Sequence, residues 1–193
     1  TTDYVPHKHA PGTPEAERYM ARLDEELARI AEHGVALGVV ADHGMNEKRV
    51  NLDLVRLLAE EGRRARFIAA IKDEHVIHHQ NLGGSAYLYV EGDVEGAREV
   101  VASADGVEVV LTRAEAAARF RLPADRIGDL LVLAEIGHTF GPNPRSVYAD
   151  VEVRSHGSLH EREVPLILNR RLEAGRELYN KDVIPALMGP GSP

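Results

Sequence analysis

Apolar residues recur along the chain with two different spacings. Between Pro14 and Gly34 they recur every three or four positions, which predicts an amphipathic helix, and Thr13 stands where a side chain can cap its first turn. The next run, 35–41, is continuously apolar, as in a strand that is buried on both faces. That run ends at Asp42, so we expect a loop to begin there.

The same alternation continues through the middle of the chain. We expect helices at about 52–61 and 94–102, and a short helix through Phe120 that begins with the Thr-x-x-Glu capping box of Thr112 and Glu115. Residues 137–151 are rich in glycine and proline and predict a long loop. The remaining apolar runs predict strands at 66–71, 86–90, 107–111, 130–134 and 164–168. Helices that alternate with strands indicate an α/β layer architecture.

Composition narrows the class of protein. The 193 residues include no cysteine, which excludes a disulfide scaffold, a thiolate zinc site and a cysteine nucleophile. Basic residues number 23 against 31 acidic ones, and the net charge of -8 disfavours nucleic acid as a partner. We found no apolar stretch of the roughly 20 residues that span a bilayer and no leader segment, so we expect a soluble, cytoplasmic protein without a membrane partner.

Three short segments combine carboxylate and imidazole side chains, the ligands that zinc takes when no thiolate is available. They contain Asp3 with His7, Asp42 with His43, and His156. Each has a plainer interpretation. Asp42 can cap a turn beside a hydrogen-bonded His43, the first residues can be a solvated terminus, and His156 can be an exposed loop histidine. Pro6 makes a regular helix face doubtful, so we expect a turn to bring Asp3 and His7 together.

Other signals for chemistry are weaker. His78 and His79 can line a pocket, but adjacent residues in an extended segment point to opposite faces and cannot easily bind one ion. The sequence has no G-x-G-x-x-G pattern, no P-loop lysine pattern and no G-x-S-x-G elbow. Nucleotide binding by a glycine-rich loop and serine hydrolase chemistry are therefore unsupported.

Four segments closely resemble the phosphonoacetate hydrolase family of the alkaline phosphatase superfamily, and the resemblance extends to about Arg170. They are TTDYVPHKHAPGTPEA at 1–16, ADHGMN at 41–46, LPADRIGDL at 122–130 and RSHG at 154–157, and HHQNLG at 78–83 adds to them. The resemblance implies an α/β fold with a layered sheet flanked by helices. Residues 1–170 would form its C-terminal portion, and 171–193 a C-terminal helix with a flexible tail.

In this family the carbon–phosphorus bond of phosphonoacetate is hydrolysed to acetate and phosphate with two divalent metal ions, typically zinc. By motif, Asp3, His7 and His156 would bind one ion, and Asp42 and His43 would belong to the shell of the second. The family's nucleophilic threonine and a further aspartate lie upstream in segments with no counterpart here, so we expect this chain to be inactive alone.

Several alternatives stay open at this stage. The substrate would be a small phosphonate or phosphate, and a homodimer is compatible with the sequence. A phosphodiesterase or phosphatase of the same superfamily, and a noncatalytic metal-binding domain, are the competing functions.

Overall fold

The computed structural model describes residues 4–69, 82–171 and 177–189. Contacts divide the chain into two compact units, which we call the first unit (residues 1–44 and 162–193) and the second unit (residues 45–161). Within the described residues, no helix combines the length and the apolar character needed to cross a membrane. We describe each unit by itself.

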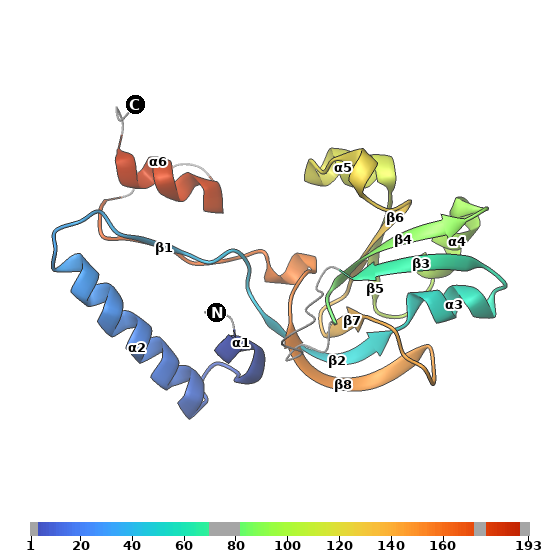
Figure 1. The fold of residues 1–193 in the computed structure, drawn as a ribbon, viewed down its shortest axis with the longest axis horizontal. Coiled ribbons are helices and arrows are strands. Elements are labelled where there is room, and N and C mark those ends of the chain that lie inside the picture. Colours follow the sequence, from blue (N-terminus) through green and yellow to red (C-terminus); the bar gives the residue numbers. More distant parts are fainter. Residues whose placement is uncertain (1–3, 70–81, 172–176, 190–193) are drawn as a thin grey trace. The chain divides into compact units, whose positions relative to one another are not determined.

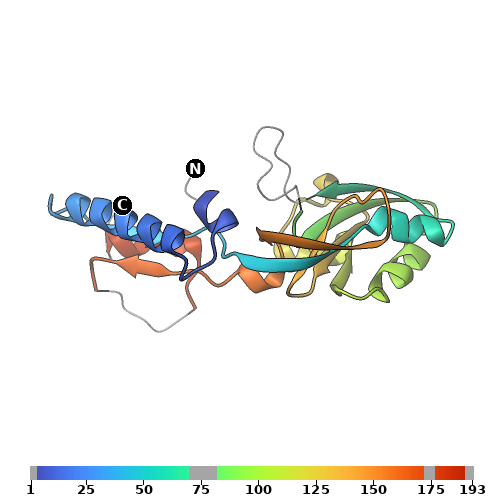
Figure 2. The ribbon, with the colours of Figure 1, turned by 90° about the horizontal axis from the view of Figure 1, so that it is seen from below.

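The first unit is built from both ends of the chain. Its elements are α1 (Tyr4–Lys8), α2 (Pro14–Ala31), β1 (Gly38–Val40), β9 (Leu166–Leu168), η3 (Asn180–Asp182) and α6 (Val183–Met188). Strands β1 and β9 pair in the antiparallel sense, with Val39 opposite Ile167. Figure 2 shows α2, in blue, beside this two-stranded ribbon, and residues of all three elements line one groove.

Helix α2 begins where the sequence predicts. The backbone N–H of Ala16 donates to Thr13 Oγ1 at 3.4 Å, and Pro14 occupies the first helical turn, where a missing N–H costs no hydrogen bond. The doubt about a helix across Pro6 was wrong, because α1 includes it. Pro6 lies in the first turn of this short helix, so it breaks no internal hydrogen bond.

Strand β1 departs from the sequence prediction. Only Gly38–Val40 is extended, and all three residues are half-buried, whereas the apolar run 35–41 predicts a longer strand covered on both faces. Val35 is exposed. The apolar composition of the run is that of a central strand, but in this chain other residues cover only part of its surface.

The main sheet of the second unit is antiparallel, with the order β3–β4–β6–β5. These four strands confirm the predictions for this part of the chain. They are β3 (Arg64–Ala69), β4 (Ser85–Glu91), β5 (Val107–Thr112) and β6 (Leu130–Ala134). The predicted end of the first of them, Ile71, lies outside the described residues.

Strand β6 sits between two apolar layers. Leu130 and Val132 pack into a core with α3 (Leu54–Glu60) and α4 (Val94–Ala102), whereas Leu131 and Leu133 pack with α5 (Arg113–Phe120). Because successive side chains of a strand point to opposite faces, a continuous apolar run serves both layers. Figure 1 shows α5 on one side of the sheet and α3 with α4 on the other.

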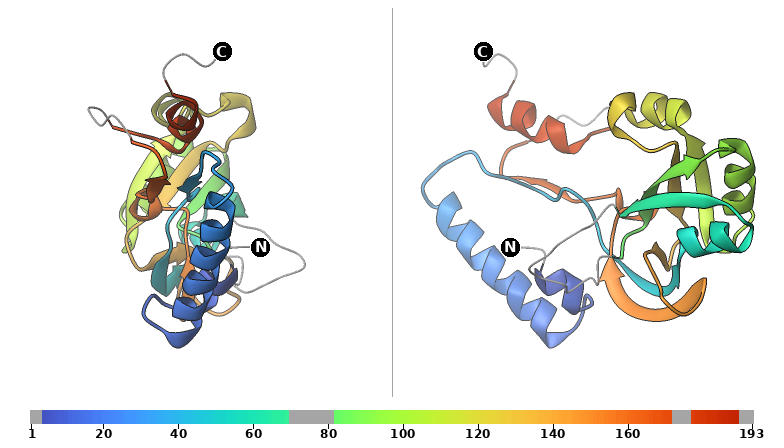
Figure 3. Two further views of the ribbon diagram at one scale, coloured as in Figure 1. Left: turned by 90° about the vertical axis from the view of Figure 1, so that its left-hand side faces the viewer. Right: turned by 45° about the vertical axis from the view of Figure 1, so that its right-hand side comes forward.

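A second sheet corrects the prediction of a long loop over 137–151. It contains β2 (Asn46–Leu52) between β7 (His138–Phe140) and β8 (Tyr148–Ser155), parallel to β7 and antiparallel to β8. The irregular part is therefore only 141–147. The register shifts between Lys48 and Val50, and the orange strand β8 bends along its length in Figures 1 and 3.

Helix ends follow local chemistry. Helix α4 has the predicted bounds, and the capping box of Thr112 and Glu115 starts α5. Helix α3 begins two residues later than predicted, because Leu52 ends β2 and Asp53 caps the helix by accepting from the N–H groups of Val55 and Arg56. Two 3-10 turns, η1 (Ala124–Arg126) and η2 (Leu159–Glu161), complete the unit.

Candidate metal centre

Asp42 and His43 lie on the loop that directly follows β1. Asp42 Oδ2 and His43 Nε2 are 3.7 Å apart, and the Asp42 side chain is 88% exposed. The backbone N–H of His43 donates to Asp42 Oδ1 at 3.0 Å, so the carboxylate lies back over the turn toward the imidazole. The side chains of these two candidate ligands, which the resemblance assigns to one ion, therefore lie close together.

The hydrogen bond of the His43 ring suits a metal ligand. His43 Nδ1 lies 2.9 Å from the carbonyl oxygen of Gly44, which can only accept, so this contact favours a proton on Nδ1 and, in the neutral ring, leaves Nε2 as the nitrogen that could bind a metal. Zinc takes imidazole nitrogen and carboxylate oxygen at about 2.0 to 2.2 Å, so atoms 3.7 Å apart can both reach one ion. The two donors are of the kind that a divalent cation takes.

The side chain of Asn180, in η3, holds the same loop through two hydrogen bonds. Its Nδ2 donates to the carbonyl oxygens of Ala41 at 2.9 Å and Asp42 at 3.2 Å. No local pattern predicts this contact, because Asn180 is 138 residues from Asp42. The backbone of the ligand loop is thus held by a residue near the other end of the chain.

The first candidate segment is described only in part. His7 lies in α1 and is buried, whereas Asp3 is outside the described residues. His78 and His79 are also outside them. The proposed pairing of Asp3 with His7 therefore stays a prediction.

His156 lies in the second unit, directly after β8, and is half-buried. Its carbonyl oxygen accepts from the N–H of Gly84 at 2.8 Å, and the preceding Ser155 donates its hydroxyl to the carbonyl of Leu82. Gly157 has φ +105°, which favours glycine at this turn. These hydrogen bonds and the turn at Gly157 therefore fix the position of the His156 backbone.

A buried polar cluster secures the other end of this loop. Ser158 donates to Glu161 Oε2 through its N–H at 2.8 Å and its hydroxyl at 2.7 Å. The other carboxylate oxygen of Glu161, Oε1, accepts hydrogen bonds from Lys48 Nζ at 2.7 Å and from Asn46 Nδ2 at 3.0 Å. Lys48 and Asn46 belong to β2, so the cluster ties the His156 loop to the second sheet.

The charge state of Glu161 follows from these contacts. Burial alone raises the pKa of its carboxyl group, but the hydrogen bonds from Lys48 and Ser158 and the charge of Lys48 outweigh burial and hold the pKa below its ordinary value. Glu161 is therefore a carboxylate at neutral pH. Sequence reasoning missed this cluster, because Lys48 and Glu161 are 113 residues apart and the polar residues of β2 look solvent-facing.

The candidate ligands belong to both units. His7, Asp42 and His43 are in the first unit, and His156 is in the second. Within the part of the chain that the structure describes, no group of three or more His, Asp or Glu side chains could hold a metal ion. Asp42 and His43 are candidate ligands whose side chains lie close together, and their role in a metal centre stays a prediction.

A mixed α/β fold with a carboxylate and an imidazole directly after a strand is compatible with a metal-binding enzyme. Comparison with known families makes the class specific. Residues 1–159 match the family described as type I phosphodiesterase / nucleotide pyrophosphatase. The chain belongs to this family, and thus to the alkaline phosphatase superfamily.

Solved structures agree with this assignment. The chain is 37% identical to phosphonoacetate hydrolase from Sinorhizobium meliloti 1021, with TM-scores of 0.84 for its complex with phosphonoacetate and 0.83 for its complex with phosphonoformate. The match covers 96% of this chain and 50% of that protein. Human ectonucleotide pyrophosphatase / phosphodiesterase 5 is 16% identical over 96% of this chain and 50% of its own, and its TM-score of 0.67 shows a shared fold. The chain therefore spans about half the length of these relatives.

Proposed function

We propose that this chain supplies part of the two-metal centre of a hydrolase that cleaves the carbon–phosphorus bond of phosphonoacetate. The observation that carries the proposal is the convergence of Asp42 Oδ2 and His43 Nε2, with Nδ1 of the ring in contact with Gly44. Asp42 and His43 would hold one zinc ion, and Asp3, His7 and His156 would hold the other. The similarity to the Sinorhizobium meliloti enzyme, which binds phosphonoacetate, supports this substrate class.

Two bound cations would stabilise negative charge on the phosphoryl oxygens and lower the pKa of an attacking hydroxyl. The residues of this chain have distinct roles in that chemistry. Asp42 would offer a carboxylate oxygen to the cation, and His43 would offer Nε2 of a ring whose orientation is set by the contact with Gly44. The hydroxyl nucleophile would come from the half of the domain that this chain does not cover, so the isolated chain binds metal without turnover.

A second function within the family is cleavage of a phosphate ester. The match of residues 1–159 to the phosphodiesterase and nucleotide pyrophosphatase family supports it, because the same donor set can serve either reaction. The two functions differ in what binds the part of the substrate that is not cleaved. Phosphate release from phosphonoacetate and from an aryl phosphate ester, measured side by side on a protein with the complete domain, separates them.

Zinc binding by the 193-residue chain tests the ligand assignment directly. The Asp42→Asn/His43→Gln variant should lose zinc that the unchanged chain retains in equilibrium dialysis with metal analysis. His160→Gln is the matched control, because Nε2 of His160 already bonds to Glu108 at 2.7 Å. The assignment fails if the double variant keeps the zinc content of the unchanged chain, or if the control loses as much.

His156 requires the complete domain. There, His156→Ala should abolish phosphate release and lower the content of one metal ion, whereas His160→Gln should change neither. Normal rate and normal metal content in His156→Ala would contradict its role as a ligand.

A further inference from the structure

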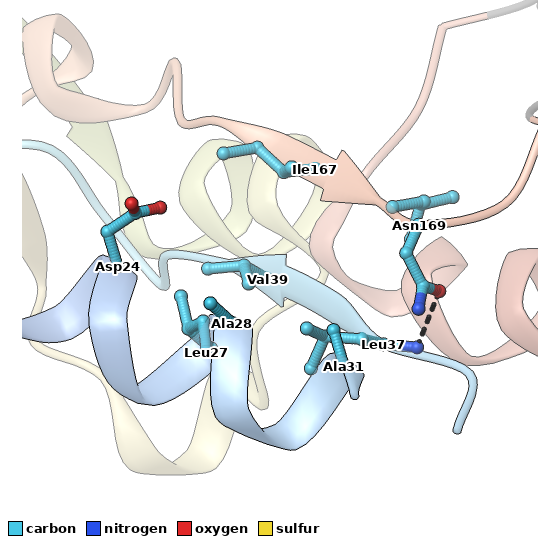
Figure 4. Close-up of a pocket in the computed structure, with 9 residues that line it drawn as sticks. Asp24, Leu27, Ala28, Ala31, Leu37, Val39, Ile167 and Asn169 are labelled. Carbon is cyan, nitrogen blue, oxygen red and sulfur yellow. Dashed lines mark hydrogen bonds between the residues drawn. The ribbon is translucent and has the colours of Figure 1, made fainter. Parts of the chain in front are cut away.

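A buried ion pair lies close to one of the candidate metal ligands in the second unit. Lys48 and Glu161 are both buried, and Glu161 belongs to η2, which follows His156 shortly along the chain. The groove of the first unit is different, because it is lined chiefly by apolar residues with Asp24 as its one charged side chain (Figure 4). Buried charge is thus found beside the loop of His156 and not in the groove.

Glu161 uses both carboxylate oxygens to connect the His156 loop to β2. Oε2 accepts from the N–H and the hydroxyl of Ser158, at 2.8 Å and 2.7 Å. Oε1 accepts from Lys48 Nζ at 2.7 Å and from Asn46 Nδ2 at 3.0 Å. Each oxygen therefore has two donors, so Glu161 is suited to holding the loop and not to binding a metal ion itself.

Ser158 anchors the far side of the turn that carries His156. Gly157 lies between them with φ +105°, and glycine allows more backbone rotation than any other residue. The bonds from Ser158 to Glu161 limit that rotation. Gly84 packs closely against the same anchor, because a Cβ atom placed at Gly84 would lie 2.7 Å from the backbone N and the Cβ of Ser158. The turn is therefore held on both sides of His156.

Stability alone does not account for a charged pair at this position. Burial of an ion pair costs desolvation, and well-packed apolar side chains in its place often give equal or greater stability. Apolar side chains could not accept the two hydrogen bonds of Ser158. The carboxylate of Glu161 is thus suited to fixing Ser158, and Lys48 is suited to compensating the buried charge.

We propose that Glu161 is a positioning residue for His156, because it fixes Ser158 and so holds the imidazole in one orientation toward its metal ion. This inference rests on the proposed function, in which His156 binds one of the two ions. Glu161 acts through Ser158, and Lys48 acts through Glu161. Loss of groups that orient metal ligands typically weakens metal affinity by about 10- to 100-fold.

Zinc titration of the 193-residue chain tests the inference, since turnover needs the complete domain but Asp3, His7 and His156 all belong to this chain. The readout is the set of NMR signals from the His156 ring, which are assigned by their loss in His156→Gln. In the unchanged chain these signals should shift as zinc is added.

The Lys48→Met/Glu161→Leu variant removes both charges together, so no unpaired charge is left inside and the second unit should stay folded. In this variant the midpoint of the His156 shift should move to a zinc concentration at least about tenfold higher. The signals of His43 should titrate as in the unchanged chain, because His43 belongs to the first unit. Loss of stability alone would not move the midpoint of a folded protein.

Ser158→Ala keeps the test decisive if the double variant does not fold. It leaves the buried ion pair intact and removes the hydroxyl that donates to Glu161, so the midpoint should rise roughly threefold, the effect of one lost hydrogen bond. Arg49→Met/Glu47→Leu is the matched control, because it makes the same changes at an exposed ion pair of β2. Its midpoint should equal that of the unchanged chain.

The outcomes separate this inference from the proposed function. Equal midpoints in the unchanged chain and in the Glu161 and Ser158 variants would overturn the positioning role and leave His156 as a ligand. Equal weakening by the Arg49 control would also overturn it. If zinc does not shift the His156 signals of the unchanged chain, the assignment of His156 as a ligand fails, and the positioning role fails with it.

Discussion

Lys48 and Glu161 form an ion pair inside the second unit, with 2.7 Å between Nζ and Oε1 and side-chain exposures of 0% and 1%. A buried pair of this kind matters most when one partner is removed, because the other is left as an uncompensated charge away from water. Here the pair also joins β2 to the segment that follows His156.

Lys48→Met should therefore be strongly destabilising. We expect the free energy of unfolding of the second unit to fall by about 3 to 5 kcal/mol, measured by urea denaturation. Arg49→Met is the matched control, because the neighbouring Arg49 makes only exposed ion pairs with Glu47 and Glu152, and it should cost about 0 to 1 kcal/mol. Similar losses in the two variants would contradict the role of the buried pair.

The lowered pKa of Glu161 predicts an acid dependence of stability. The folded pKa lies below its ordinary value of 4.5, so the contribution of the carboxylate to the free energy of unfolding is complete above that value. It is lost as the pH falls through the folded pKa. Urea denaturation between pH 6 and pH 3 should show this loss in the unchanged chain.

The Lys48→Met/Glu161→Leu variant serves for comparison, because it removes both charges and the titrating group. Its stability should fall less steeply below pH 4.5, the ordinary pKa of the group that it lacks. Backbone hydrogen bonds chiefly lower the pKa of Asp93 and that of Glu115. Both groups are present in the two proteins, so their contributions to the pH dependence of stability cancel in the comparison. Identical pH slopes in the two proteins would show that Glu161 does not carry the effect.

Asn180 should affect zinc affinity without touching the metal, if Asp42 and His43 form the site we propose. Asn180→Ala removes the donor to the carbonyls of Ala41 and Asp42, so the loop that carries Asp42 and His43 loses two hydrogen bonds to its backbone. We expect roughly tenfold weaker zinc binding by titration calorimetry, at the lower end of effects reported for groups that orient metal ligands.

Asn169→Ala is the matched control for that prediction. Asn169 bonds to the backbone of Leu37 and Val35 at the other end of β1, and so it supports the same strand without contacting the ligand loop. Its loss should change zinc affinity by less than about twofold, since no ligand depends on it. Equal effects of the two substitutions would mean that Asn180 acts only through the stability of the first unit.

Capping residues and apolar runs predicted the helix starts and strands that depend on residues close together in the chain. Thr13 and Pro14 start α2, and the capping box of Thr112 and Glu115 starts α5, because these contacts span three residues or fewer. The continuous apolar run of β6 predicted a strand covered on both faces, and α4 and α5 provide that cover. Asp42 and His43 are adjacent on one turn, so their closeness needs no distant partner, and their role as metal ligands stays a prediction.

The second sheet could not be predicted from those signals. Residues 46–52 are mostly polar, and Lys48 looks solvent-facing until Glu161 is placed beside it. Patterns of apolar residues identify buried faces only when burial is apolar, and here a charge is buried by pairing. The glycines and prolines of 137–151 pointed to a loop, although β7 and β8 contain residues from this range.

The sequence by itself determined the α/β class, the helix starts, the apolar strands and the resemblance that led to the candidate ligands. Tertiary structure alone decided that β2 lies between β7 and β8, that Lys48 meets Glu161, and that Asn180 holds the loop of Asp42. The physical reason is the distance along the chain over which each kind of interaction acts. Caps and periodicity act within a few residues, whereas pairing, burial of charge and coverage of an apolar surface depend on segments brought together only by folding.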